Sequence, residues 1–259
     1  MNRNKLQLHG WCLGWLVTMA FLESGIATAQ DTASSKTSPS VPSRADVEDV
    51  DAFLAPYREL ATEWENDVAK ISANNASEGS DEHVLFIGSS SFRLWDSIAE
   101  DMAPVRVVRR AFGGAKYRDL AIYAPECVRG LKFGRAMIFL GNDIRGKEDD
   151  NDPDTVARFA RIVIATLRRE QPDVKIYLVA VTPTESRWKH WPLIQQVNQR
   201  LQSIAESEPG VMFVSTADAY LNADGKPRAE LFKDDRLHLN ADGYRIWAAI
   251  LKEALARAE

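Results

Sequence analysis

The amino-acid sequence predicts an α/β fold, a three-layer α/β/α sandwich around a mostly parallel sheet of five strands. From residue 83 onward, short apolar runs rich in β-forming residues alternate with stretches of helical periodicity. Strands that alternate with helices are joined by crossovers, so they pair in parallel and are covered on both faces. There are no internal repeats, and one domain accommodates the pattern. The expected strands are 83–88, 105–112, 135–141, 175–181 and 211–215, and the expected helices lie near 91–100, 116–124, 154–170, 191–206 and 241–257.

The first 29 residues are expected to be a secretory signal peptide and not part of the fold. Arg3 and Lys5 form a positively charged start, the apolar run over 11–22 is too short to span a bilayer comfortably, and 27–29 end in a small-x-small pattern. Cys12 lies inside the apolar run, which argues against a lipoprotein anchor. The sequence therefore predicts export to the periplasm or the medium, without a stable membrane anchor after cleavage. An uncleaved N-terminal anchor is the alternative.

Two segments separate this leader from the first strand. Residues 30–46 are rich in Ser, Thr, Pro and Ala without an apolar period, which predicts a flexible linker. Residues 47–72 carry large apolar side chains at mostly helical spacing, interrupted at Pro56. We expect one or two amphipathic helices here, packed as an N-terminal extension on a core domain over 83–259.

Composition and charge exclude several classes of partner. The chain has 259 residues with a formal net charge of −5, and both signs are mixed along it. Such a chain has no electrostatic footprint for nucleic acid or an anionic membrane. Arg106, Arg109 and Arg110 alternate with apolar residues and are expected to be strand and surface residues. Cys127 is the one cysteine left after signal cleavage, so no intramolecular disulfide is possible, and we expect an inert thiol. The oligomeric state stays open.

An Asp/His pair near the C-terminus carries the first chemical signal. Asp235 stands three residues before His238, just ahead of the last expected helix. A histidine that acts as a general base needs one ring nitrogen held so that the other can accept a proton, and a carboxylate does this. His83 and His190 have no carboxylate at that spacing. Asp234, Asp235 and His238 could instead bind a metal, but a catalytic zinc needs three protein ligands and no second His or Cys lies nearby, so we expect no metal and no cofactor.

A serine at the end of the first expected strand supplies the candidate nucleophile. Gly88-Ser89-Ser90-Ser91 follows a buried apolar run and precedes a helix. Ser90 would then lie at a helix N-terminus, where free N–H groups favour a developing negative charge. The alternative is that the three serines only cap the helix. Together with Asp235 and His238, the nucleophile is the preferred interpretation.

Other residues are expected at the same edge of the sheet. Gly113-Gly114 follows the second expected strand, Asn142-Asp143 follows the third, and sites in such sheets form at the carboxyl ends of strands. A nucleophile, an oriented base and N–H donors are what acyl transfer requires. The glycines could serve only as a tight turn and Asn142 only as a loop residue. Neither a dinucleotide-binding nor a P-loop spacing is present.

At this point the chain resembles the SGNH hydrolases, or GDSL esterase/lipase superfamily, over residues 83–259. The resemblance implies a flavodoxin-like sheet, Ser90 as nucleophile, His238 as base oriented by Asp235, and an oxyanion hole made by the Ser90 and Gly114 N–H groups and the Asn142 side chain. Three departures stand out: Ser89 replaces an Asp, Leu140 replaces a Gly, and Arg109-Arg110 replaces Asn-Arg, which predicts a lost outer polar contact. The four matching blocks are Gly88-Ser89-Ser90, Gly114, Asn142-Asp143 and Asp235-Arg236-Leu237-His238.

The leading hypothesis is an exported serine esterase that needs no metal or cofactor. Its substrate would be a small-molecule or carbohydrate ester, with short acyl or O-acetyl groups preferred and lysophospholipid possible. Trp188 and Trp191 follow the fourth expected strand and either stack against such a substrate or pack on the core. An acyltransferase with the same triad and a non-catalytic carbohydrate-binding module are the alternatives.

Overall fold

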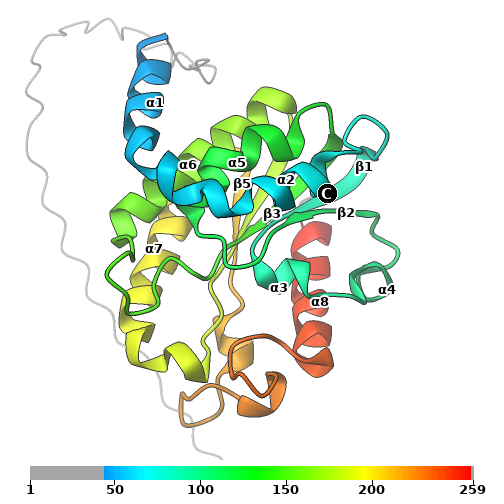
Figure 1. Cartoon of the computed structure of the whole chain (residues 1–259). Helices are drawn as coiled ribbons and strands as arrows, with labels where there is room; N and C mark the ends of the chain where they lie inside the picture. Colours follow the sequence, from blue (N-terminus) through cyan, green and yellow to red (C-terminus); the bar gives the residue numbers. More distant parts are fainter. Residues whose placement is uncertain (1–43, 258–259) are drawn as a thin grey trace, which may run out of the picture. The chain divides into compact units, whose positions relative to one another are not determined.

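One sheet organises the part of the chain that the structure describes. The computed structural model describes residues 44–257, so the signal peptide expected at 1–29 and the linker expected from residue 30, up to residue 43, lie outside it. Its strands are β1 Gly79–Gly88, β2 Val107–Ala111, β3 Lys132–Phe139, β4 Lys175–Val179 and β5 Val211–Val214. Their order is β2-β1-β3-β4-β5, and every pairing is parallel (Figure 1). The predicted five-stranded parallel sheet is confirmed.

Helices cover both faces of this sheet, as predicted. Along β1, Leu85 and Ile87 face one apolar core while Val84 and Phe86 face the other, because side chains alternate along a strand. The first core is closed by α5 Tyr117–Val128, α6 Pro153–Glu170 and α7 Trp191–Ser207. The second is closed by α3 Ser90–Arg93, α4 Ile98–Met102 and α8 Ala241–Ala256. Short 3₁₀ turns lie at η2 Glu185–His190, η3 Ala217–Tyr220 and η4 Ala229–Leu231.

The N-terminal extension packs on the α5 side of the sheet (Figure 1). It consists of α1 Arg44–Arg58, the 3₁₀ turn η1 Glu59–Trp64 and α2 Glu65–Ser72. The helix begins at Arg44, inside the expected linker, and continues past Pro56 to Arg58, where the chain tightens into η1. The α-helix therefore ends two residues after Pro56, and α1 and α2 are the one or two helices expected here.

Two further expectations are corrected. The helix expected near 91–100 is divided into α3 and α4. Arg109 Nη1 donates to the carbonyl oxygens of Phe92 in α3 and of Trp95 after it. Arg110 is 3% exposed and not a surface residue. Asn75 and Glu78 accept hydrogen bonds from its guanidinium, and a buried charge needs such partners.

None of the helices between residues 44 and 257 is long and apolar enough to cross a membrane.

The carboxyl ends of the strands form the edge that carries the predicted site. The chain leaves β1 for β2 at one margin of the sheet and returns to β3 on the other side of β1. In open α/β sheets, ligands bind where the strand order reverses in this way. Ser90 follows β1 and Asn142 follows β3, so both flank this switch point.

Candidate active site

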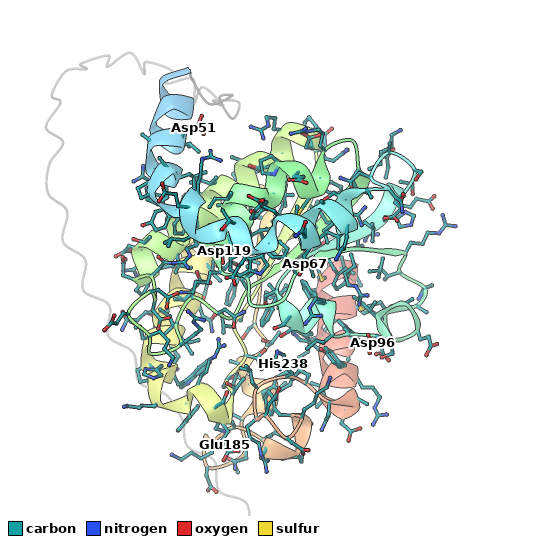
Figure 2. All side chains as sticks on the ribbon, viewed as in Figure 1. Asp51, Asp67, Asp96, Asp119, Glu185 and His238 are labelled. Atoms are coloured by element: carbon teal, nitrogen blue, oxygen red, sulfur yellow. The ribbon has the colours of Figure 1, made fainter. Side chains whose placement is uncertain are left out.

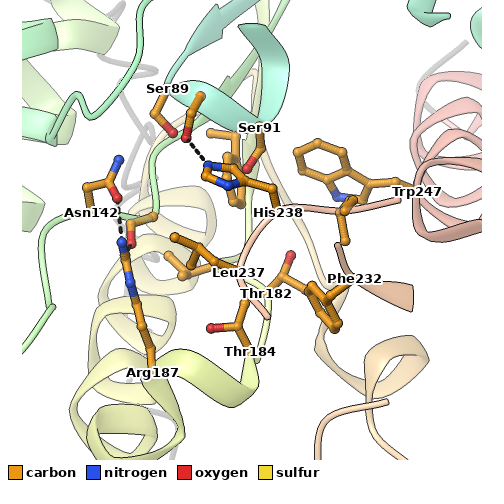
Figure 3. A pocket seen from close by; sticks show the side chains of 15 residues that line it. Ser89, Ser91, Asn142, Thr182, Thr184, Arg187, Phe232, Leu237, His238 and Trp247 are labelled. Atoms are coloured by element: carbon orange, nitrogen blue, oxygen red, sulfur yellow. Dashed lines mark hydrogen bonds between the residues drawn. The ribbon is translucent and has the colours of Figure 1, made fainter. Parts of the chain in front are cut away.

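The structure brings Ser90, His238 and Asp235 into one hydrogen-bonded chain. His238 Nε2 lies 2.9 Å from Ser90 Oγ, a contact drawn as a dashed line at His238 in Figure 3. His238 Nδ1 lies 2.6 Å from Asp235 Oδ2. A carboxylate only accepts, so it assigns the proton to Nδ1 and leaves the Nε2 lone pair facing the serine hydroxyl. Figure 2 shows His238 among the C-terminal loops close to α3. This arrangement lets His238 withdraw a proton from Ser90.

Asp235 is fixed by its own turn. Its Oδ1 atom accepts the backbone N–H groups of Leu237 and His238, each over 2.9 Å. Arg236 adopts φ = 54°, a left-handed conformation that reverses the chain between the carboxylate and the imidazole. Partial burial opposes ionisation, but the hydrogen bonds from the His238 ring and the two N–H groups prevail and lower the pKa of Asp235 to about 2. The carboxylate is therefore charged at neutral pH.

Ser90 is presented by a tight turn at the end of β1. A Cβ on Gly88 would lie 1.9 Å from the Phe139 carbonyl oxygen of β3, so only glycine fits there. Ser89 N donates to the same carbonyl over 3.0 Å, and Ser90 then opens α3. The Ser89 hydroxyl makes no capping hydrogen bond, and the Ser90 hydroxyl is bound to His238. The capping alternative therefore does not describe these two serines.

Contacts from both neighbouring elements hold α3 in place. Tyr244 Oη of α8 donates to the Ser91 carbonyl over 2.8 Å, and the Tyr244 ring stacks on Trp95 with centroids 5.0 Å apart. Arg109 of β2 donates to the Phe92 and Trp95 carbonyl oxygens over 3.2 and 2.9 Å. The sequence predicts the loss of a polar contact at Arg109, and in the structure its guanidinium makes two hydrogen bonds to the segment that follows Ser90.

Of the three groups expected to form an oxyanion hole, Ser90 and Asn142 line the hollow, and Gly114 is not among its lining residues. Within residues 44–257, neither the Ser90 nor the Gly114 N–H donates to a protein acceptor, and Ser90 is the first residue of its helix, where N–H groups have no intrahelical partner. Gly114 has φ = +79°, which favours glycine. Asn142 is 8% exposed and lines the same hollow as Ser90. Its Nδ2 donates one hydrogen to the Ala115 carbonyl over 3.1 Å, which leaves a second hydrogen on that amide.

Arg187 is a site residue that the sequence analysis missed. It lies in η2 after β4, and its guanidinium donates to the Gly141 carbonyl and, over 2.6 Å, to Asn142 Oδ1. Burial and the charge of Arg145 lower the pKa of Arg187 to about 10, so it remains a cation at neutral pH. A guanidinium has no acceptor, so the amide oxygen of Asn142 must face it and the amide nitrogen must face away (Figure 3). An isolated arginine in a loop carries no signal in the sequence that could have identified it.

The family model described as the GDSL-like lipase/acylhydrolase family matches residues 78–246, more than half of the chain. The protein belongs to this family. The SGNH/GDSL resemblance found in the sequence is thereby confirmed. A search of curated proteins gave no match.

Solved structures of low sequence identity share the fold. A candidate platelet activating factor from Streptococcus pneumonia is 21% identical with a TM-score of 0.64, covering 83% of this chain and 100% of that one. A GDSL-like lipase from Bacteroides thetaiotaomicron is 20% identical with a TM-score of 0.63, covering 74% of this chain and 98% of that one. A mutant of an acetyl-xylooligosaccharide esterase from Geobacillus Stearmophilus is 22% identical with a TM-score of 0.55, covering 68% of this chain and 94% of that one. All three agree with a three-layer α/β fold.

The two tryptophans expected to bind substrate in this GDSL-family chain lie apart from the hollow at Ser90. Their rings stack on each other with centroids 6.0 Å apart. Trp191 is 7% exposed in the α5-side core, and Trp188 packs against that core with the Lys226 ammonium 5.5 Å from its ring centroid. Neither lines the hollow. Leu140, at the position of the family's glycine, is also buried in that core, while the next residue, Gly141, lines the hollow.

The hollow itself is small and mixed in character. Among the residues that the structure describes, no group of three or more His, Cys, Asp or Glu is arranged to hold a metal ion. The hollow leaves about 30 Å³ for water-sized groups. Its lining consists of Ser89, Ser90, Ser91, Phe139, Gly141, Asn142, Val181, Thr182, Thr184, Arg187, Phe232, Leu237, His238, Leu239 and Trp247.

Proposed function

We propose that this GDSL-family protein is a serine esterase that cleaves carboxylic esters through an acyl-enzyme. The observation that carries the proposal is the hydrogen-bonded chain from Ser90 through His238 to Asp235. Ser90 is the nucleophile, His238 the general base and Asp235 the group that orients it. The Ser90 N–H, the Gly114 N–H and the Asn142 amide would receive the oxyanion.

The reaction runs in two halves on these groups. His238 Nε2 takes the proton from Ser90 Oγ as the oxygen attacks the ester carbonyl, and the negative charge develops on the carbonyl oxygen. The imidazolium then gives its proton to the leaving alcohol, and an acyl group remains on Ser90. Water enters, His238 removes its proton, and the acid leaves as Ser90 recovers its hydrogen. Asp235 stays ionised throughout and stabilises the charged imidazolium.

The hollow beside Ser90 supports short acyl groups. It offers about 30 Å³, which is room for roughly two water molecules by the usual requirement of about 10–15 Å³ each. A hollow of this size favours an acetyl group over a long alkyl chain. O-acetyl carbohydrate esters are therefore the favoured substrate class.

The purified protein tests both levels of this proposal. Hydrolysis of p-nitrophenyl acetate should be fast and that of octanoate and longer esters should be absent, and the reverse profile would overturn the short-acyl preference. A fluorophosphonate probe, with its adduct mapped by mass spectrometry, should label Ser90. Labelling elsewhere, or none, would favour a binding module and end the esterase proposal.

Export is proposed from the signal-like segment at 1–29, which lies outside the described residues. The mature protein should begin near Gln30 outside the cytoplasm. N-terminal sequencing of the exported material measures this, and a start at Met1 would contradict it.

A further inference from the structure

The N-terminal extension reaches the catalytic edge through one side chain. Trp64, the last residue of η1, is 7% exposed, and its indole Nε1 donates to the Gly113 carbonyl oxygen over 2.7 Å. The same turn is anchored to α5, because Tyr123 Oη donates to the Ala61 carbonyl over 2.8 Å. Trp64 lies outside residues 78–246, to which the family model extends. A segment outside the matched domain therefore touches the turn that carries an expected oxyanion donor.

The bond acts on the peptide plane that contains this donor. The Gly113 carbonyl and the Gly114 N–H belong to one planar trans peptide and point in opposite directions. A donor that fixes the carbonyl oxygen on one side therefore fixes the direction of the N–H on the other. Donation to the carbonyl also polarises the amide and strengthens its N–H as a hydrogen-bond donor.

Two consecutive glycines give this peptide no side chain to restrict its rotation. Gly114 has φ = +79°, which disfavours any other residue there, and a Cβ on Gly113 would lie 3.0 Å from the guanidinium of Arg93. Glycine pairs explore more backbone conformations than any other dipeptide, so this plane rotates easily unless it is held. Rigidity at the position has to come from a neighbour, and Trp64 provides the hydrogen bond.

We propose that Trp64 is a positioning residue for the oxyanion hole, which its indole N–H preorganises through the Gly113–Gly114 peptide. This rests on the proposed esterase function. Removal of a whole oxyanion donor costs about 10²–10³ in kcat. Loss of the Trp64 bond leaves the Gly114 N–H present but less well aimed, so the expected fall in kcat is smaller, roughly tenfold.

The test compares two variants, each of which removes one hydrogen bond between η1 and the rest of the protein. Trp64→Phe keeps an aromatic ring and removes the N–H, whereas Tyr123→Phe removes the η1 anchor at Ala61 without touching Gly113. Trp64→Phe should lower kcat for p-nitrophenyl acetate about tenfold with KM within twofold. Its affinity for a trifluoromethyl ketone, which mimics the tetrahedral state, should fall by the same factor. The pH profile should stay unchanged because His238 and Asp235 are not affected.

Tyr123→Phe should keep wild-type kcat while both variants lose similar thermal stability. Wild-type kcat in a folded Trp64→Phe protein, or an equal loss in Tyr123→Phe, would overturn the proposal. If Trp64→Phe does not fold, 3-benzothienylalanine at position 64 replaces the N–H by sulfur in a ring of the same shape, and it must show the same loss. Failure of the esterase function itself is distinguishable, since the wild-type protein would then be inactive and unlabelled by the fluorophosphonate.

Discussion

The proposed active site has an acid–base side and an oxyanion side of Ser90, and the two are built in different ways. The acid–base side, Asp235 and His238, is a single turn whose partners lie two or three residues apart. The oxyanion side, Gly113, Gly114 and Asn142, takes its support from distant segments. Trp64 stands 49 residues from Gly113, and Arg187 stands 45 residues from Asn142. One side is a local motif, and the other depends on tertiary structure.

The acid–base side and the oxyanion side also differ in solvent exposure. The side chains of Asp235 and His238 are 47% and 21% exposed, whereas Asn142 is 8% exposed as a residue and is hydrogen-bonded to the half-buried Arg187. A turn at the surface can place an acid and a base with few tertiary contacts. Donors that must stabilise an oxyanion work best when water is excluded and their orientation is fixed in advance. Variants far from Ser90 should therefore affect the oxyanion side more readily than the acid–base side.

The largest effects are expected on the acid–base side. Ser90→Ala and His238→Ala should each lower kcat by about 10⁶, and the double variant should be little worse, because triad members act as a unit. His83→Ala, a histidine that contacts Ser80 in β1, serves as the control and should retain activity. Steady-state kinetics with circular dichroism measures this. A folded Ser90→Ala protein with near wild-type kcat would contradict the serine mechanism.

Asp235→Ala should come next, with a fall of roughly 10⁴ in kcat. His238 keeps its ring but loses its orientation and the stabilisation of its charged form, and the turn loses the acceptor of two N–H groups. The exposed neighbour Asp234 supplies a matched control, since Asp234→Ala removes an adjacent carboxylate that makes no contact with the imidazole. Equal losses in the two variants would mean that charge near the site matters and the specific contact does not.

The same division explains what the sequence could and could not predict. Asp235 and His238 lie within one short segment, so their spacing alone indicated a pair, and Ser90 followed a recognisable strand and turn. Arg187 and Trp64 act through hydrogen bonds between segments that only the folded chain brings together, and an isolated Arg or Trp carries no local signal. Arg110 was placed at the surface for the same reason, because its partners Asn75 and Glu78 come from another segment.

The oxyanion side should show an intermediate effect that depends on its support. Asn142→Ala should lower kcat by about 10²–10³ with KM less affected. Arg187→Met should lower kcat about tenfold, and adding it to Asn142→Ala should cost little more, because both act on one amide. Arg145→Met removes a neighbouring cation that bonds Asp149 and should leave kcat unchanged. Additive losses in the double variant would show that Arg187 acts independently of Asn142.

Two carboxyl groups, one on each side of Ser90, predict how the stability of the folded state depends on pH. Asp143 on the oxyanion side is fully buried, and its pKa is raised to about 7 by burial and by the charge of Asp119, against the lowering effect of the Tyr117 N–H. Asp235 has its pKa lowered to about 2. Both groups have an ordinary value of 3.8, so the folded state holds the Asp143 proton more tightly than the unfolded state and the Asp235 proton less tightly.

Opposite pH dependences of stability follow. Relative to Asp143→Asn, the wild-type protein should lose stability as pH rises from about 4 to about 7, since only the unfolded chain has released the Asp143 proton across that range. Relative to Asp235→Asn, it should lose stability as pH falls from about 4 to about 2, because the folded-state advantage of the carboxylate disappears on protonation. Urea unfolding of the three proteins across pH 2–8 measures both differences. Each variant is the control for the other, and a difference of the same sign in both would contradict the assignment of the two carboxyl groups.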